Sequence, residues 1–175
     1  QAYVEDPASA SAEYGAQFRT DVESFISREA VEAVTITDRI ELAPARSNQY
    51  FGFVDAAGGS GQDAMTMAIA HIDRKARLAV VDAARCVKPP FSPEQVVIEF
   101  CDLLKSYKIR RVIGDAWGGD FVREQFRKRD IHYQVSTKDK SAIYAELLPL
   151  INSQRVELPD IKQMRDELIG LERKN

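Results

Sequence analysis

The order of its apolar segments constrains this chain most: three strand-like segments come in succession, and helix-like and strand-like segments then alternate. The first three lie at 50–54, 64–72 and 77–86, and polar or glycine-rich turns separate them. Short turns favour antiparallel neighbours, so these strands are predicted to form a meander. One sheet is expected, because 175 residues suffice for one well-packed domain and hardly for two.

The second half of the chain predicts strands that pair in parallel. Ser92-Pro93-Glu94-Gln95 is typical of a helix start, because Ser92 can cap the helix and Pro93 suits its first position. The segments after this helix alternate: a strand at 111–115, a helix at 120–129, a strand at 132–135, a helix at 138–152, a strand at 155–158 and a helix capped by Asp160. Helices between strands permit parallel pairing. This order predicts an α/β fold with a ribonuclease H-like mixed sheet flanked by helices.

The first 45 residues differ from the rest and are predicted to form a helical appendage. A helix is expected to start at Pro7 and to present the apolar side chains Tyr14, Phe18, Val22 and Phe25 on one face. Ser27 can cap a second short helix, and Pro44 marks a break. We therefore expect an appendage over 1–45 and the sheet domain over 46–175.

Composition and charge narrow the classes of partner. The apolar runs reach about half of the roughly 20 residues that a membrane span needs, so a cytoplasmic protein is expected. Cys86 and Cys101 have no His or second Cys nearby, which predicts buried thiols rather than a zinc site or disulfide. The net charge of -3 does not indicate a particular class of partner, but residues 105–140 hold 10 basic and 5 acidic side chains. This bias indicates a phosphate-binding surface or a solvated helix face. The candidate contacts are Arg110, Arg111, Arg123, Arg127 and Lys128.

Two aspartates end two of the predicted strands. Asp55 and Asp115 each follow an apolar strand, and the first and fourth strands of such a sheet lie side by side in parallel. Both carboxylates are therefore expected in one crevice, where a hard cation such as Mg²⁺ or Mn²⁺ relieves their repulsion. Two such ions can activate water and stabilise the leaving oxygen in phosphodiester hydrolysis. The alternative for either aspartate is a turn former or a helix cap, but Asp120 is better placed to cap the helix at 120–129.

The sequence leaves more than one role possible for several other residues near these aspartates. Asp63, Asp120, Lys138 and Lys140 are candidates for positions around the metal ligands, although Asp63 also fits a turn residue and the lysines also fit exposed, solubilising side chains. The turn at 58–61 holds three glycines, but the Lys and the Ser or Thr of a phosphate-binding P-loop do not follow it. A tight hairpin that needs positive φ and a close backbone approach is predicted instead.

Three segments resemble a known family. Residues 53–63, 113–119 and 140–144 look like the nuclease domain of the large terminase subunit of tailed bacteriophages. Residues 5–25 are similar to the segment that joins the packaging ATPase of that family to its nuclease. The resemblance covers nearly the whole chain, and the combination of Asp55 with Asp115 in this order is its most specific part.

The resemblance implies a function and a set of partners. Asp55 and Asp115 would be two of the metal-binding acids of an endonuclease with two Mg²⁺ or Mn²⁺ ions. It would cut concatemeric double-stranded DNA during genome packaging in the host cell cytoplasm. The implied partners are the terminase small subunit, the portal protein and the ATPase domain of the full-length chain, with no membrane.

The family also supplies a third acid after its last helix, and the matching position is expected beyond Asn175, so the nuclease domain is predicted to be incomplete at its C-terminus. Two alternatives stay open. One is a resolvase, integrase or exonuclease on the same fold, because fold does not settle substrate. The other is a catalytically incomplete module that binds DNA or docks to the motor.

Overall fold

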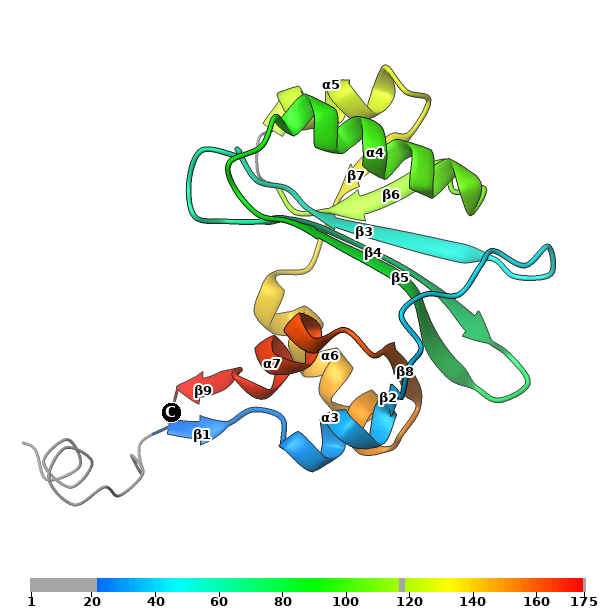
Figure 1. Ribbon diagram of the computed structural model, residues 1–175, viewed down its shortest axis with the longest axis vertical. Coiled ribbons are helices and arrows are strands. Elements are labelled where there is room, and N and C mark those ends of the chain that lie inside the picture. Colours follow the sequence, from blue (N-terminus) through cyan, green and yellow to red (C-terminus); the bar gives the residue numbers. More distant parts are fainter. Residues whose placement is uncertain (1–21, 117–118, 175) are drawn as a thin grey trace, which may run out of the picture. The chain divides into compact units, whose positions relative to one another are not determined.

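The computed structural model describes residues 22–116 and 119–174 (Figure 1). The chain divides into two compact units, one of Val34–Asp160 and one in which Gln1–Ala33 joins Ile161–Asn175. We call these the sheet unit and the terminal unit. The expected division into 1–45 and 46–175 stays a prediction.

Seven strands form one sheet in the described part of the sheet unit. Their spatial order is β2 (Thr35–Ile36), β8 (Val156–Pro159), β5 (Leu78–Val87), β4 (Met65–Asp73), β3 (Tyr50–Asp55), β6 (Arg111–Gly114) and β7 (His132–Val135). The strands β3, β4 and β5 pair antiparallel, which confirms the predicted meander. The other pairs, β3 with β6, β6 with β7, β5 with β8 and β2 with β8, are parallel. The sheet is therefore mixed, as predicted.

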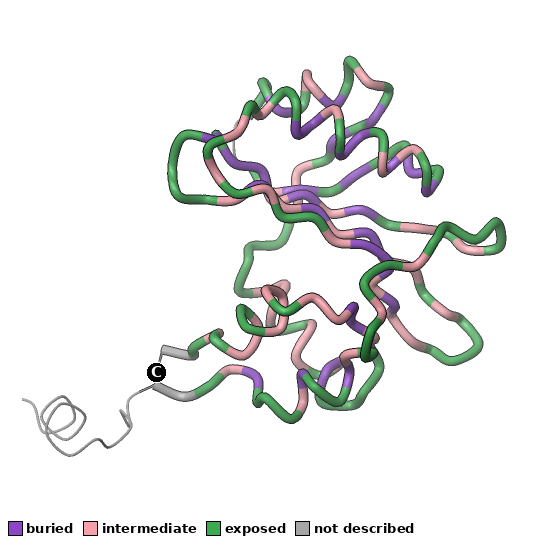
Figure 2. The backbone as a smooth tube through the Cα atoms, viewed as in Figure 1, coloured by how far each residue is buried: buried purple, intermediate pink, exposed green. Residues whose placement is uncertain are grey.

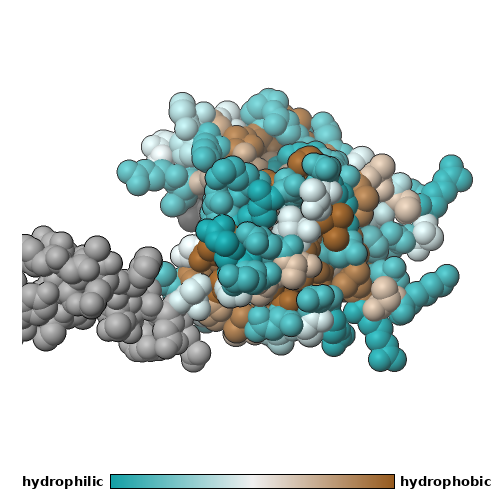
Figure 3. Space-filling model, turned by 60° about the horizontal axis from the view of Figure 1, so that its bottom comes forward, coloured by the Kyte–Doolittle hydropathy of each residue, from teal (hydrophilic) through white to brown (hydrophobic). Residues whose placement is uncertain are grey.

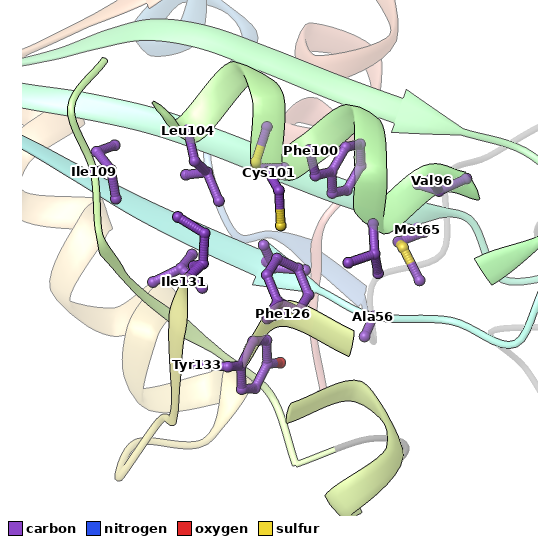
Figure 4. Packing of buried hydrophobic residues seen from close by; sticks show 14 of the residues in the cluster. Ala56, Met65, Val96, Phe100, Cys101, Leu104, Ile109, Phe126, Ile131 and Tyr133 are labelled. Atoms are coloured by element: carbon purple, nitrogen blue, oxygen red, sulfur yellow. The ribbon is translucent and has the colours of Figure 1, made fainter. Parts of the chain in front are cut away.

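Two helices, α4 (Pro93–Ser106) and α5 (Gly119–Arg127), lie together over one face of this sheet (Figure 1). Ser92 caps α4 as predicted, since its hydroxyl accepts a hydrogen bond from the Gln95 N–H over 3.4 Å. The apolar faces of both helices pack on the sheet in a core that Figure 4 shows from close by. Phe100, Leu104 and Phe126 are fully buried there, and each contributes about 1.5–3 kcal/mol through removal from water.

The turn between β3 and β4 uses one of its glycines as predicted. Gly59 has a φ of +78°, and a Cβ at this position would lie 2.2 Å from the Phe91 carbonyl oxygen. Its own carbonyl accepts a hydrogen bond from the Phe91 N–H over 3.2 Å. The backbone before α4 therefore approaches the turn too closely for any side chain.

A bulge in β5 carries a buried charge that the sequence did not indicate. Ile69 pairs with Ala83 and Ala70 with Val81, so Asp82 is an extra residue in β5. The Asp82 carboxylate is 1% exposed, and its Oδ2 lies 2.7 Å from Nδ1 of His71. Burial raises the pKa of Asp82, and the hydrogen bond to His71 opposes this shift.

The last long helix, α6 (Lys140–Asn152), begins two residues later than predicted. The reason is its cap: Asp139 accepts a hydrogen bond from the Ala142 N–H over 2.7 Å, so the helix starts after Asp139. No described helix is both long and apolar enough to cross a lipid bilayer.

The terminal unit combines segments far apart in the sequence. Strand β1 (Val22–Ser24) pairs antiparallel with β9 (Glu172–Lys174), and α3 (Arg28–Val34) and α7 (Lys162–Ile169) accompany them. Ser27 caps α3 as predicted, through a 3.2 Å hydrogen bond from the Ala30 N–H. The predicted helix from Pro7 to Phe25 is wrong at its end, where β1 forms instead, and its residues up to 21 lie outside the described part.

Two further sequence expectations are wrong. Asp160 does not cap α7, because Ile161 occupies the cap position and the Asp160 carboxylate accepts a 3.1 Å hydrogen bond from the Asp38 N–H. Cys86 is exposed rather than buried, since it lies near the end of β5, whereas Cys101 is buried in α4 as expected.

Buried residues alternate with less buried ones along β3 and β4 (Figure 2). Gly52, Val54 and Val112 point to the core, whereas the alternate residues Phe51 and Ile113 are 54% and 42% exposed. Brown areas among hydrophilic ones in Figure 3 likewise show that apolar side chains reach the surface. The alternation places Asp55 and Asp115 with Phe51 and Ile113, opposite α4 and α5.

Candidate active site

The carboxyl ends of β3 and β6 lie side by side and carry the two predicted acids. Val54 pairs with Gly114 in the parallel register, so Asp55 and Asp115 come next on each strand. Two hydrogen bonds from backbone N–H groups continue beyond the pair. The Asp115 N–H donates to the Val54 carbonyl over 3.3 Å, and the Ala56 N–H donates to Oδ1 of Asp115 over 3.4 Å. The topology expected from the sequence is confirmed at this edge of the sheet.

Both aspartates line one cavity of about 530 Å³. The Asp55 side chain is 38% exposed, and Asp115 is half-buried. The cavity wall also holds oxygen-bearing side chains from β4, the loop after β7 and the start of α6: Thr66, Ser136, Thr137, Asp139 and Tyr144. The cavity is therefore rich in oxygen ligands, and Phe53 and Ile143 supply an apolar part.

Two lysines line the same cavity, Lys138 from the loop before α6 and Lys140 from the first position of this helix. Lys140 places its Nζ 3.5 Å from Oδ2 of Asp55, and Lys138 forms a salt bridge with Glu146, with 2.6 Å from Nζ to Oε2. Asp139, between them, lines the cavity and caps α6. Nothing in the sequence distinguishes Asp139 from an ordinary helix cap, so its place on the cavity wall is visible only in the structure.

Tyr133 of β7 holds Asp115 from the core side. Its hydroxyl donates to the Asp115 carbonyl over 2.9 Å and lies 3.5 Å from Oδ1 of the same residue. The side chain is buried, and this burial, followed by the nearby Asp115, raises the pKa of the Tyr133 phenol above its usual range. The sequence does not indicate this role of Tyr133, because nothing in a four-residue strand shows what its side chain reaches in the neighbouring strand.

The two other candidate acids do not line the cavity. Asp63 is exposed in the loop between β3 and β4. Asp120 lies in the first turn of α5 with its side chain 99% exposed, and it forms a 3.1 Å salt bridge with Arg123. Of the four residues predicted around the metal ligands, the structure thus brings only Lys138 and Lys140 to the cavity.

The predicted basic contacts are all exposed but occupy different places. Arg110 and Arg111 lie at the start of β6, and four residues of strand span about 13 Å, so they are at the end opposite Asp115. Arg123 and Arg127 lie on α5, where Arg127 forms a 2.6 Å salt bridge with Glu124. Lys128 follows this helix directly.

The chemistry of the cavity fits a hard divalent cation. No group of three or more His, Cys, Asp or Glu side chains suited to a metal is found among the described residues. Asp55 and Asp115 nevertheless line one cavity, and the other described residues of its lining include hydroxyl side chains but no thiol or imidazole. All-oxygen ligation suits Mg²⁺ and Mn²⁺ rather than softer metals.

Comparison with known proteins identifies the fold. Neither protein-family models nor curated proteins match the chain. Among solved structures, the large terminase nuclease of thermophilic phage G20c with bound magnesium superposes with a TM-score of 0.65 at 18% identity, over 85% of this chain and 82% of that chain. The chain has the fold of a large-terminase nuclease.

Large terminases of two other phages share this nuclease fold. The HK97 bacteriophage large terminase matches with a TM-score of 0.64 at 13% identity, over 86% of this chain and 37% of that chain. The P22 large terminase nuclease domain gives a TM-score of 0.59 at 10% identity, over 78% of this chain and 73% of that one. The ribonuclease H-like fold predicted from the order of the elements is thereby confirmed.

Proposed function

We propose that this chain is the endonuclease domain of a phage DNA-packaging terminase and hydrolyses phosphodiester bonds of concatemeric double-stranded DNA with two divalent metal ions. The observation that carries this proposal is the position of Asp55 and Asp115 at equivalent ends of two parallel strands, on the wall of one cavity. The fold adds support, since the similar nuclease of phage G20c has been solved with magnesium, zinc and cobalt.

Asp55 and Asp115 are the residues proposed to hold the metal ions. Bound Mg²⁺ or Mn²⁺ would supply an activated water and stabilise charge on the leaving oxygen. The chain's own residues prepare the site: Ala56 and Tyr133 fix the Asp115 side chain, and Lys140 offsets the negative charge of Asp55. Lys138 and Lys140 also place positive charge where a phosphate backbone would enter the cavity.

The substrate and partners follow from the same proposal. The exposed basic side chains Arg110, Arg111, Arg123, Arg127 and Lys128 would extend the contact with double-stranded DNA beyond the cavity. In the host cell cytoplasm, the domain would work with a terminase small subunit, a portal protein and a terminase ATPase domain.

One observation favours a second function, a module that binds DNA without cutting it. Asp139 brings a third carboxylate to the cavity wall, but this carboxylate already accepts a hydrogen bond from the Ala142 N–H in the first turn of α6. If two acids hold metal too weakly for catalysis, the basic surface would still bind the phosphate backbone.

Cleavage of supercoiled plasmid in Mn²⁺ tests the proposal. Asp55→Asn and Asp115→Asn should each lower the cleavage rate at least about 100-fold, because each removes a ligand charge, while the unfolding free energy changes by less than about 1 kcal/mol. Asp63→Asn is the matched control, since Asp63 is exposed and does not line the cavity, and it should cut normally. Equal cleavage by all three variants would refute the proposal.

Cleavage assays on DNA substrates of different form distinguish the remaining candidate functions. A terminase nuclease should cut linear and supercoiled duplexes alike, a resolvase should prefer branched DNA, and an exonuclease should require an end. Retention of DNA at low salt with no product at any concentration of divalent ions would instead establish the binding module.

A further inference from the structure

We propose that Tyr133 is a positioning residue that holds the Asp115 carboxylate in place for the metal ions, an inference that rests on the proposed nuclease function. Tyr133 belongs to β7, the edge strand, and pairs in register with Val112 rather than with Asp115. Its side chain therefore has to run along the sheet toward the carboxyl end of β6 to reach Asp115. The 2.9 Å and 3.5 Å contacts of its hydroxyl with Asp115 show that it does.

The backbone next to Asp115 is shaped around the Tyr133 ring. A Cβ on Gly114 would lie 2.0 Å from the Tyr133 hydroxyl oxygen, 2.4 Å from Cζ and 2.6 Å from the Val54 carbonyl oxygen. Real Cβ atoms essentially never approach other atoms so closely, and a shift of the Val54 backbone would distort the sheet. Only glycine at position 114 allows the phenol to pass and its hydroxyl to reach the next residue.

The ring itself is held on its other side. Tyr133 is 5% exposed and packs against Phe126 of α5 with 5.2 Å between the ring centroids. Figure 4 shows Tyr133 at the border of the buried cluster, next to Phe126. The hydroxyl thus has a fixed position, and it is placed by the core rather than by solvent.

The contacts of Asp115 show what this fixed hydroxyl does. The Ala56 N–H and the Tyr133 hydroxyl both approach Oδ1, and the Asp115 carbonyl accepts from the same hydroxyl. The Tyr133 hydroxyl therefore anchors the main chain of Asp115 and lies within reach of its side chain, which also accepts from the Ala56 N–H. Removal of a group that orients a metal ligand in this way typically lowers metal affinity 10–100-fold.

Tyr133→Phe tests the proposal, because it removes one oxygen and keeps the ring. Tyr107→Phe is the matched control: Tyr107 is also buried, at 2%, and its hydroxyl donates to a backbone carbonyl, that of Leu42, away from the cavity. Both variants lose one buried hydrogen bond, so both should lower the unfolding free energy by about 0.5–1.5 kcal/mol.

Two measurements on the 175-residue chain distinguish the variants. Titration of Mn²⁺ by electron paramagnetic resonance should give a dissociation constant about 10-fold or more higher for Tyr133→Phe and unchanged for Tyr107→Phe. Crystal structures without metal should show the Asp115 side chain turned or disordered only in Tyr133→Phe.

The outcomes separate this inference from the proposed function. An unchanged Asp115 conformation, or an equal loss of Mn²⁺ affinity in both variants, would overturn the positioning role even if the chain cuts DNA. If Asp115 turns in Tyr133→Phe but the unaltered chain binds no Mn²⁺, the positioning of Asp115 stands and the nuclease function fails.

Discussion

The backbone N–H of Ala56 donates a hydrogen bond to Oδ1 of Asp115 over 3.4 Å. Ala56 directly follows Asp55, so the residue after one candidate metal ligand holds the side chain of the other. The two strand ends are therefore linked by this hydrogen bond from main chain to side chain, and they cannot separate without losing it. Such a link explains how two carboxylates in one cavity keep their places although they repel each other.

Lys140 is expected to compete with a divalent ion for Asp55. Its Nζ lies 3.5 Å from Oδ2 of Asp55, and both side chains reach solvent. Removing one charge at this distance changes the energy of the site by about 1 kcal/mol in water, so Lys140→Met should tighten Mn²⁺ binding roughly fivefold. Calorimetric titration with Mn²⁺ at low salt measures this change in the dissociation constant. Lys138→Met is the control, since Lys138 pairs with Glu146 and should have a smaller effect. Weaker Mn²⁺ binding by Lys140→Met would contradict the competition.

Gly114→Ala is expected to destabilise the sheet unit by about 1–3 kcal/mol. The added Cβ would overlap both the Tyr133 phenol and the Val54 carbonyl, and the sheet has to distort to make room. Gly61→Ala is the matched control, because nothing lies within 4 Å of a Cβ at that position. Urea unfolding should therefore give a lower unfolding free energy for Gly114→Ala than for Gly61→Ala. A Gly114→Ala variant as stable as Gly61→Ala would show that the backbone beside Asp115 is not packed as described.

The two cysteines are expected to differ in reactivity. Cys86 is exposed, whereas burial of Cys101 raises its pKa from 9.0 to about 11, so its thiolate is scarce at pH 8. A chromogenic disulfide reagent should modify one thiol in the native chain and two in denaturant. Because the folded pKa is the raised one, Cys101 stabilises the fold fully below pH 9, and this contribution is lost as the pH rises toward 11. Rapid modification of both native thiols would be incompatible with this burial.

Lys128 is expected to matter more for DNA binding than Arg127. Arg127 is paired with Glu124 at 2.6 Å, whereas no ion pair of Lys128 is found within 22–116 and 119–174. An unpaired cation gains more from a phosphate, so Lys128→Ala should weaken duplex binding more than Arg127→Ala and lower the salt slope by about 1. Fluorescence anisotropy at several salt concentrations measures both quantities. Identical salt slopes for the unaltered chain and Lys128→Ala would exclude a phosphate contact.

Much of the fold follows from local pattern. The meander of β3, β4 and β5 and the start of α4 at Ser92 are encoded in short segments, and the structure has them where the sequence predicts. Parallel pairing of β3 with β6 follows from the helix between them, and it brings Asp55 and Asp115 to one edge. The two acids could therefore be named before any coordinates, because strand ends are visible in a sequence.

The remaining features depend on contacts between distant residues. Asp160 binds the Asp38 N–H, 122 residues away, and so does not cap the adjacent helix. Strand β1 forms because β9 lies beside it, although Val22 fits a helical pattern with Phe18 and Phe25. The reach of Tyr133 to Asp115 depends on the absence of a side chain at Gly114 in the neighbouring strand. Periodicity within one segment carries no information on such lateral contacts.

Anomalous diffraction from crystals soaked in MnCl₂ shows whether Asp55 and Asp115 hold a metal ion together. We expect anomalous density in the cavity, within bonding distance of carboxylate oxygens of both Asp55 and Asp115, and its loss in Asp115→Asn. Manganese bound only elsewhere on the chain, or a cavity with no anomalous density at millimolar Mn²⁺, would contradict it.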